Sequence, residues 1–363
     1  MKLIISSLTA LLFSGALLSA QMPGMVTMQQ ASVPQGTTLG ANTTSGAAGI
    51  ALGNRVVMRG YVDFIFDYKD VEDTIQQEKF NTSSDIDFLF DFSPVTGEVH
   101  INLNPSPNPG KDQVGLEQAF GRYSINRDFN ISFGRQLTAL GYEADEAPGL
   151  YSVSNAYLVD VAIGTAQSIL GSNLAAAKDV STRRNYKDGV RANFNNGRFG
   201  LTLGLHDGYW VEDDFNKDNI AIDLAASLMI FPGLEARLGY AHQESETLGD
   251  SISQFNSWIE WNPNDLTLAF EYDNFDIATA DYWDLLLLAN YQFTDFFGAT
   301  FKYTHEDLEL GANNVEADRI TFALLFTITQ NLFFNVEYSH SEVDTGATDY
   351  DVEEFYLEGL LTF

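Results

Sequence analysis

The chain has 363 residues, of which 50 are Asp or Glu and 19 are Lys or Arg, so its formal net charge is −31, and it contains no cysteine. The acidic surplus excludes the basic surface that nucleic-acid binding requires. The lack of cysteine excludes disulfides, thiolate metal sites and cysteine nucleophiles.

The first residues have the pattern of an export signal. Lys2 supplies a positive start, residues 8–13 are mostly apolar, and residues 18–20 end on Ala20. This order predicts a secretory signal peptide at residues 1–20. Residues 21–55 follow as a flexible N-terminal segment, because 21–50 are poor in charge and rich in Gly, Ala, Ser, Thr, Met and Gln.

From residue 56 to residue 363 the chain alternates apolar and polar residues in short segments. The last segment is the clearest, with Phe355, Leu357, Gly359, Leu361 and Phe363 on one face and mainly polar residues on the other. A period of two indicates strands with one apolar and one polar face. The predicted strands are 56–68, 84–92, 95–104, 115–125, 129–138, 186–195, 198–207, 219–230, 234–243, 252–262, 266–274, 281–293, 297–306, 317–328, 332–342 and 352–363.

The connectors between these strands alternate between short and long. Gly, Asn, Asp and Pro mark the short ones, as at 93–94, 195–197 and 231–233. This rhythm is typical of a transmembrane barrel, which has short periplasmic turns and longer external loops. The sequence therefore predicts an all-β fold: an antiparallel up-and-down transmembrane β-barrel of about 16 strands over residues 56–363. A soluble β-sandwich is the alternative, since its strands also alternate.

One connector, residues 139–185, is far longer than the others, and loops of this length usually have a function or lack order. Its stretch 156–177 is largely apolar. Because a sixteen-stranded barrel encloses an aqueous lumen, we expect this loop to fold inward and narrow the channel.

Charged residues of this loop and of the wall are candidates for the constriction. Rings of charge set the selectivity of a pore, and the predicted inward faces carry more acidic than basic residues, which predicts a mild cation preference. The alternative is that these residues are solvated lumen positions without a selective role. The candidate constriction residues are Arg59, Arg135, Glu143, Asp145, Glu146, Asp160, Lys187 and Arg191.

No catalytic or metal-binding motif emerges from the sequence. The five histidines lie on separate predicted strands, and neither a nucleophile elbow nor a phosphate-binding loop is present. The run from Asp214 to Asp218 begins like a calcium loop but has Asn219 and Ala225 where an EF-hand requires Gly and Glu. We therefore expect neither enzymatic activity nor a cofactor or bound metal, although acidic external loops remain able to bind Ca²⁺ or Mg²⁺ loosely.

Several runs are similar to the OmpL-like β-barrel porin family. They are RGYVD at 59–63, LEQAF at 116–120, GRQ at 134–136, GYE at 141–143, DGVR at 188–191 and LGLHDGYW at 203–210. The resemblance spans roughly residues 56–363. It implies an outer-membrane porin of a Gram-negative bacterium without catalytic residues.

Together these observations predict a porin in the outer membrane that passes small hydrophilic solutes and ions by diffusion. Its partners would be those solutes and ions and the membrane lipid. A homotrimer follows by analogy with other sixteen-stranded porins. The alternative function is a closed or narrow outer-membrane barrel that acts as an adhesin or surface receptor.

Overall fold

The computed structural model describes residues 49–72, 75–104, 113–144, 146–157, 186–210, 221–245, 250–277, 280–310 and 313–363. The predicted signal peptide and residues 21–48 lie outside this part of the chain. Within the predicted N-terminal segment, a short strand β1 (Ile50–Ala51) pairs with the first long strand, so this end of the segment is attached to the barrel.

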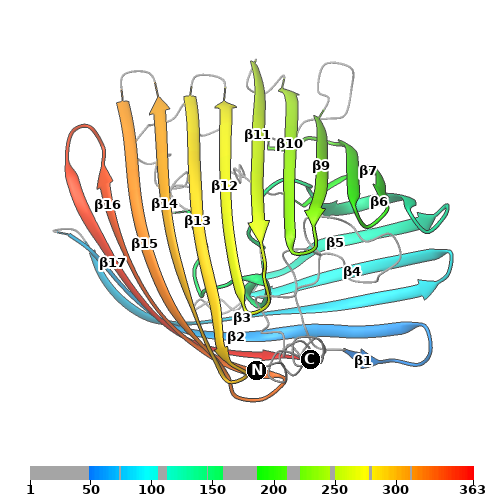
Figure 1. Cartoon of the computed structure of the whole chain (residues 1–363), viewed down its shortest axis with the longest axis horizontal. Helices are drawn as coiled ribbons and strands as arrows, with labels where there is room; N and C mark the ends of the chain where they lie inside the picture. Colours follow the sequence, from blue (N-terminus) through cyan, green and yellow to red (C-terminus); the bar gives the residue numbers. More distant parts are fainter. Residues whose placement is uncertain are drawn as a thin grey trace, which may run out of the picture.

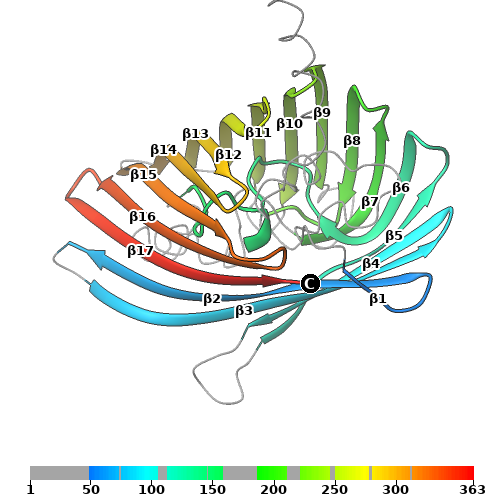
Figure 2. The same cartoon turned by 60° about the horizontal axis from the view of Figure 1, so that its bottom comes forward.

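Sixteen long strands form one antiparallel sheet that closes on itself (Figures 1 and 2). They are β2 (Val56–Val71), β3 (Ile75–Phe92), β4 (Val95–Asn104), β5 (Gln113–Ser124), β6 (Phe129–Leu137), β7 (Tyr186–Asn195), β8 (Phe199–His206), β9 (Ala221–Phe231), β10 (Leu234–Ser245), β11 (Asp250–Trp261), β12 (Leu266–Ile277), β13 (Ala280–Thr294), β14 (Phe297–Leu310), β15 (Asn313–Thr327), β16 (Leu332–Asp344) and β17 (Asp349–Thr362). Within the described ranges, no helix has the length and hydropathy needed to cross a bilayer.

The ring closes between the last strand and the first long one. β17 pairs with β2 from Val352 opposite Val71 to Thr362 opposite Tyr61. Beyond this pairing, Phe363 and Gly60 exchange two backbone hydrogen bonds of 3.0 Å. The C-terminal residue therefore completes the closure, and the predicted closed barrel of sixteen strands is confirmed.

The tight turns occur where the sequence predicts them, at one end of the barrel (Figure 1). Gly197, Gly233 and Asn264 have positive φ values of 86°, 87° and 57°. Asn126 stabilises another turn by accepting hydrogen bonds of 2.9 Å from the backbone N–H groups of Asp128 and Phe129. Residues that tolerate positive φ or bond to their own backbone thus fix the chain reversals.

Four of the predicted long connectors are mostly strand instead. The predicted loop 69–83 is strand up to residue 71, where β2 ends, and again from residue 75, where β3 begins. The same happens at β12–β13, at β14–β15 and at β16–β17. Residues such as Gln76, Gln77 and Glu78 are polar on both faces of the strand, so no apolar period marks them. A hairpin that projects from the apolar zone meets water on both sides, and its strands lose the alternation that identifies them.

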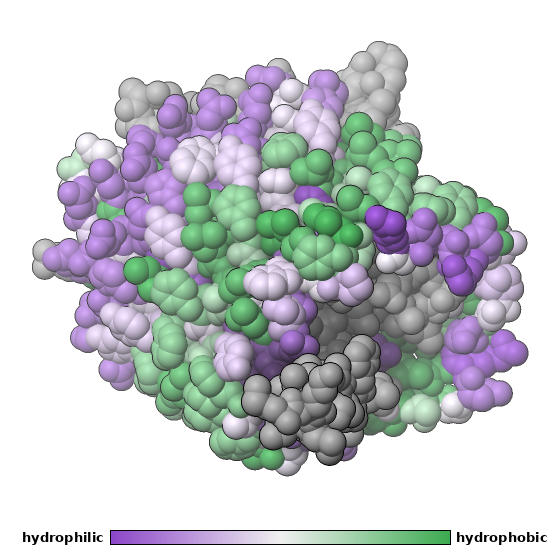
Figure 3. All heavy atoms as spheres, viewed as in Figure 1, coloured by the Kyte–Doolittle hydropathy of each residue, from purple (hydrophilic) through white to green (hydrophobic). Residues whose placement is uncertain are grey.

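The two faces of the wall differ as the alternation predicts. On β8, Leu203 is 53% exposed on the outside, whereas Thr202 on the inside is 4% exposed. Figure 3 shows apolar side chains gathered across the middle of one outer face, with hydrophilic side chains toward the edge of the longer hairpins. The lumen face instead carries carboxylates, guanidinium groups and hydroxyls, which position the site described next.

Candidate pore constriction

The chain segment that follows β6 lies inside the barrel. Its described parts, residues 138–144 and 146–157, are mostly buried and lie within the ring of strands (Figure 2). The segment contains one 3₁₀ turn, η1 (Ala147–Gly149), and no strand. Its backbone N–H and C=O groups therefore need partners from elsewhere, because unpaired buried backbone groups are costly.

The segment is attached to the wall from its first residues. Arg191 on β7 donates a hydrogen bond of 2.6 Å to the carbonyl of Leu137 and lies 3.5 Å from Asp223 on β9. Asp223 in turn accepts a hydrogen bond of 2.9 Å from the backbone N–H of Ala139. Arg237 on β10 donates to the carbonyl of Ala139. Both polar groups of Ala139 are thereby satisfied by charged lumen side chains.

The next residue, Leu140, packs directly on β10. It is fully buried in a cluster that includes Tyr209, Trp210 and Ile252. A Cβ atom at Gly239 on β10 would lie 2.9 Å from Cγ of Leu140, which is closer than two carbons pack. Glycine at 239 therefore makes room for the loop.

Tyr142 bonds to two wall carboxylates and also packs on an aromatic ring of the wall. Its backbone N–H donates to Glu271 at 2.6 Å, its hydroxyl donates to Glu260 at 2.8 Å, and its ring packs edge-on against Trp258 with centroids 5.5 Å apart. Burial, together with the charge of Glu260, raises the pKa of Tyr142 well above its ordinary value. The hydroxyl therefore stays protonated and remains a donor to β11.

Beyond Tyr142 the loop contacts a wall cation. Glu143 accepts a hydrogen bond of 3.0 Å from Lys302 on β14, and both side chains are buried. Glu143 also accepts from the backbone N–H of Ala156 at 2.6 Å, and Lys302 donates to the carbonyl of Ser154 at 2.8 Å. This pair joins the outgoing and returning arms of the loop to each other and to the wall.

Glu337 on β16 holds the returning arm. It accepts hydrogen bonds from the backbone N–H of Val153 at 2.6 Å and of Ser154 at 3.1 Å, and a third from the hydroxyl of Ser154. That hydroxyl oxygen also accepts a hydrogen bond of 2.8 Å from Arg319 on β15. One carboxylate thus receives three donors of the loop.

These contacts follow the inner wall in order. The loop meets β9 and β10 at residues 139 and 140, β11 and β12 at residue 142, and β14 to β16 at residues 143 and 153–156. At the tip, Ala147 packs against Tyr61, Phe333 and Leu360 of β2, β16 and β17. Since β17 is bonded to β2, the loop runs along the wall for more than half of the ring.

Four of the predicted constriction residues lie on the inner wall or in the loop, where the structure describes their neighbours or their burial. Glu143 and Arg191 hold the loop as described above. Glu146 lies at the loop tip close to Asp85 and Glu117, and Lys187 is buried on β7.

The other four predicted residues differ in their placement. Arg59 lies on β2 opposite Asp87 in the β2–β3 register. Arg135 lies on the other side of β6 from the buried Ser132 and Gln136, and it is 3.8 Å from Asp188 across the strand pair. We therefore leave Arg135 out of the constriction. Asp145 and Asp160 lie outside the described residues.

The wall residues that hold the loop are not singled out by the sequence. Lys302, Arg319, Glu260, Glu271 and Glu337 occupy inward positions of the predicted strands, so the alternation places them in the lumen. Nothing in the sequence indicates which of many inward charges meets a loop that bonds mainly through its backbone.

Comparison with known proteins gives the fold a context. No family model matches the chain, and none of the curated proteins does, so the resemblance to the OmpL-like family rests on its sequence runs alone. Among solved structures, the barrel is similar to OmpF of Salmonella typhi in complex with daunomycin, with a TM-score of 0.61 and 13% identity over 86% of this chain and 98% of that one. It is also similar to the outer membrane channel DcaP of Acinetobacter baumannii (0.58, 14%, 87% and 100%) and to OmpT of Vibrio cholerae (0.57, 12%, 86% and 100%). At these identities the comparison shows a porin-like fold.

Proposed function

We propose that this protein is a diffusion channel of a Gram-negative outer membrane, in which residues 138–157 narrow the bore. The observation that carries the proposal is the course of the loop. It follows the inner wall from β9 to β2 and is attached to lumen side chains along most of that path. A loop attached in this way reduces the width of a sixteen-stranded barrel, which is otherwise wide enough for an aqueous channel.

The solutes are small and hydrophilic, because the lumen face is lined by charged and hydroxyl side chains. Buried lumen carboxylates such as Glu260, Glu271 and Glu337 outnumber nearby cations such as Lys302 and Arg319. The electrostatic potential of the bore is therefore negative, which favours cations over anions. Export by the signal at residues 1–20 and assembly into a trimer belong to the same proposal. No bound cofactor is required by this mechanism.

Planar-bilayer recording of the purified protein tests the channel directly. We expect stepwise single-channel conductance, and a reversal potential in a KCl gradient that shows mild preference for K⁺. Liposome swelling with sugars of graded size then gives the limiting diameter. A clear anion preference would contradict the proposed selectivity.

A second candidate is a narrow barrel that acts as an adhesin or receptor. It is favoured by the extent to which the loop fills the space near the wall, where Tyr142, Tyr151 and Tyr157 are almost fully buried. Bilayers that show incorporated protein but no conductance steps, together with liposomes that do not swell, would support this candidate against the channel.

A further inference from the structure

A group of three carboxylates lies where the loop tip meets the wall at β3 and β5. Asp85 on β3, Glu117 on β5 and Glu146 in the loop each bring one carboxylate oxygen within 4.8 Å of the other two. Asp85 and Glu146 are buried, and Glu117 is partly buried. The three residues are far apart in the sequence, so the fold of the barrel and the inward course of the loop bring them together.

Asp85 is the unusual member of this group. It is 1% exposed, and both of its carboxylate oxygens are shielded from solvent without a hydrogen-bond donor among the described residues. Burial of a carboxylate without a partner is costly. Elsewhere along the loop, Asp223, Glu271 and Glu337 receive backbone N–H groups. Asp85 faces other carboxylates instead, an arrangement that a cation between them would stabilise.

The spacing suits a calcium ion. Calcium binds oxygen ligands at about 2.3–2.6 Å, so two ligands of one ion lie up to about 5 Å apart. The separations within the group stay under this limit. Carboxylates carried by two strands and a loop give an irregular oxygen shell, which Ca²⁺ accepts more readily than Mg²⁺, because Mg²⁺ requires a nearly ideal octahedron.

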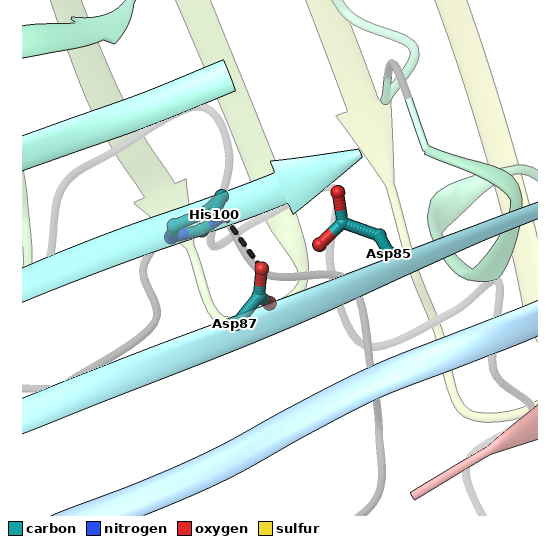
Figure 4. Close-up of side chains that lie close together, drawn as sticks. All are labelled: Asp85, Asp87 and His100. Carbon is teal, nitrogen blue, oxygen red and sulfur yellow. Dashed lines mark ion pairs between the residues drawn. The ribbon is translucent and has the colours of Figure 1, made fainter. Parts of the chain in front are cut away.

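The neighbouring histidine does not turn this into a zinc site. Figure 4 shows Asp85 beside Asp87 and His100, with an ion pair drawn between the latter two. Nδ1 of His100 lies 3.0 Å from Asp87, and Nε2 lies 3.2 Å from Glu98. The amide nitrogen of Gln118 also lies 3.2 Å from Nδ1, so both ring nitrogens already have other partners.

The other charges around the group also have partners. Arg122 on β5 lies 3.4 Å from Glu98, and Arg59 on β2 lies opposite Asp87 in the strand register. His100 and Arg122 thus lie beside Asp87 and Glu98. Among the described residues, neither carboxylate oxygen of Asp85 has such a partner.

We propose that Asp85, Glu117 and Glu146 bind a divalent cation of the Ca²⁺ type, which clamps the tip of the loop to the barrel wall. The site is independent of permeation, since it follows from the closed barrel and the loop contacts alone. The ion bridges the carboxylate of Glu146 at the loop tip to the carboxylates of Asp85 and Glu117 on the wall.

Terbium luminescence tests this site because Tb³⁺ occupies calcium sites and is sensitised by a nearby tyrosine. Tyr61 lies opposite Asp85 in the β2–β3 register and is buried. We expect the folded protein in detergent to show tyrosine-sensitised Tb³⁺ emission that Ca²⁺ displaces. Tyr61→Phe should remove most of this emission while Ca²⁺ binding, measured by calorimetry, is retained.

Three variants locate the ligands. Asp85→Asn, Glu117→Gln and Glu146→Gln should each weaken Ca²⁺ binding by at least about tenfold, since affinity depends on the number of charged ligands. Glu235→Gln is the matched control: it removes one buried lumen carboxylate on β10 and should leave binding unchanged. Circular dichroism and heat-modified gel mobility verify that each variant folds.

Measuring Ca²⁺ binding by the wild type and these variants distinguishes three cases. The three carboxylates bind an ion, or they share protons with one another and bind no ion, or acidic residues at the rim of the barrel bind Ca²⁺ loosely. A folded protein that binds no Ca²⁺ at millimolar concentration would overturn the proposal and leave shared protons to hold the carboxylates together. Binding that is equal in wild type, Asp85→Asn and Glu146→Gln would overturn it as well, by assigning the ion to the rim. Neither result depends on conductance, so the channel and the cation site fail separately.

Discussion

The two sides of the inner wall use the same residue type in different ways. On β9 to β16, Asp223, Glu271 and Glu337 accept backbone N–H groups of the loop. On β3 and β5, Asp85 and Glu117 meet a further carboxylate, Glu146. On the first side, hydrogen bonds within the chain attach the loop to the wall. On the second side, the proposed cation attaches it. Lumen carboxylates on the first side therefore serve to attach the loop.

The largest effect is expected for Glu337→Ala, on the side of the wall where carboxylates accept N–H groups of the loop. The change leaves two backbone N–H groups and one hydroxyl of residues 153 and 154 without their acceptor, at a cost of about 1–3 kcal/mol for each buried group. The returning arm should leave the wall, which chymotrypsin detects as new cleavage near Tyr151. Glu337→Gln retains an acceptor oxygen and should be cleaved much less. Equal resistance of both variants and the wild type would contradict this anchoring role.

Lys302→Met should have the next largest effect. It leaves Glu143 buried without its cation and leaves the carbonyl of Ser154 with one donor, the Ser152 hydroxyl, where it had two. Removing one partner of a buried ion pair costs on the order of 3 kcal/mol, and the bore gains net negative charge. We expect a higher K⁺ to Cl⁻ permeability ratio in bilayers. As a control, Lys79→Met removes a half-exposed cation near the end of the β2–β3 hairpin and should leave the ratio close to that of the wild type.

A smaller effect is expected for Gly239→Ala. The added Cβ would lie 2.9 Å from Leu140, and such overpacking costs about 1–3 kcal/mol. The start of the loop should become more accessible to protease while the barrel remains folded. Gly97→Ala is the comparison, because its Cβ would meet its nearest neighbour at 3.6 Å. If the two variants are equally resistant, Leu140 does not depend on close contact with β10.

Tyr142→Phe is the most conservative of these changes. It removes only the hydroxyl bonded to Glu260 at 2.8 Å and keeps the ring on Trp258. Loss of a hydrogen bond to a charged group costs about 1.5–3 kcal/mol. Thermal unfolding followed by tryptophan fluorescence measures the change. Tyr123→Phe, at an exposed ring, serves as the control and should unfold like the wild type.

The sequence predicts the wall far better than the site. Apolar alternation in segments such as 355–363 reflects the apolar outer face of the closed barrel, to which every strand contributes. The strand count and the turns at Gly197 and Gly233 are therefore confirmed. The pattern fails in the hairpin around residues 69–83, where both faces are polar. The partners of the loop were not predictable, because backbone groups of Ala139, Val153 and Ser154 make the main bonds. Every residue except proline carries the same backbone N–H, so the sequence does not show which of these groups will bind the wall.

The central claim is that the loop lies on the inner wall near β14, and a cysteine cross-link tests it most directly. The chain has no native cysteine. Thr304 on β14 donates a hydrogen bond of 3.1 Å to the carbonyl of Ala156, and Asn193 on β7 lies on the opposite side of the ring. With a short thiol-specific linker, the pair Ala156→Cys and Thr304→Cys should cross-link readily, and the pair Ala156→Cys and Asn193→Cys should not. Failure of the first pair to react, or equal yields from both, would contradict the account.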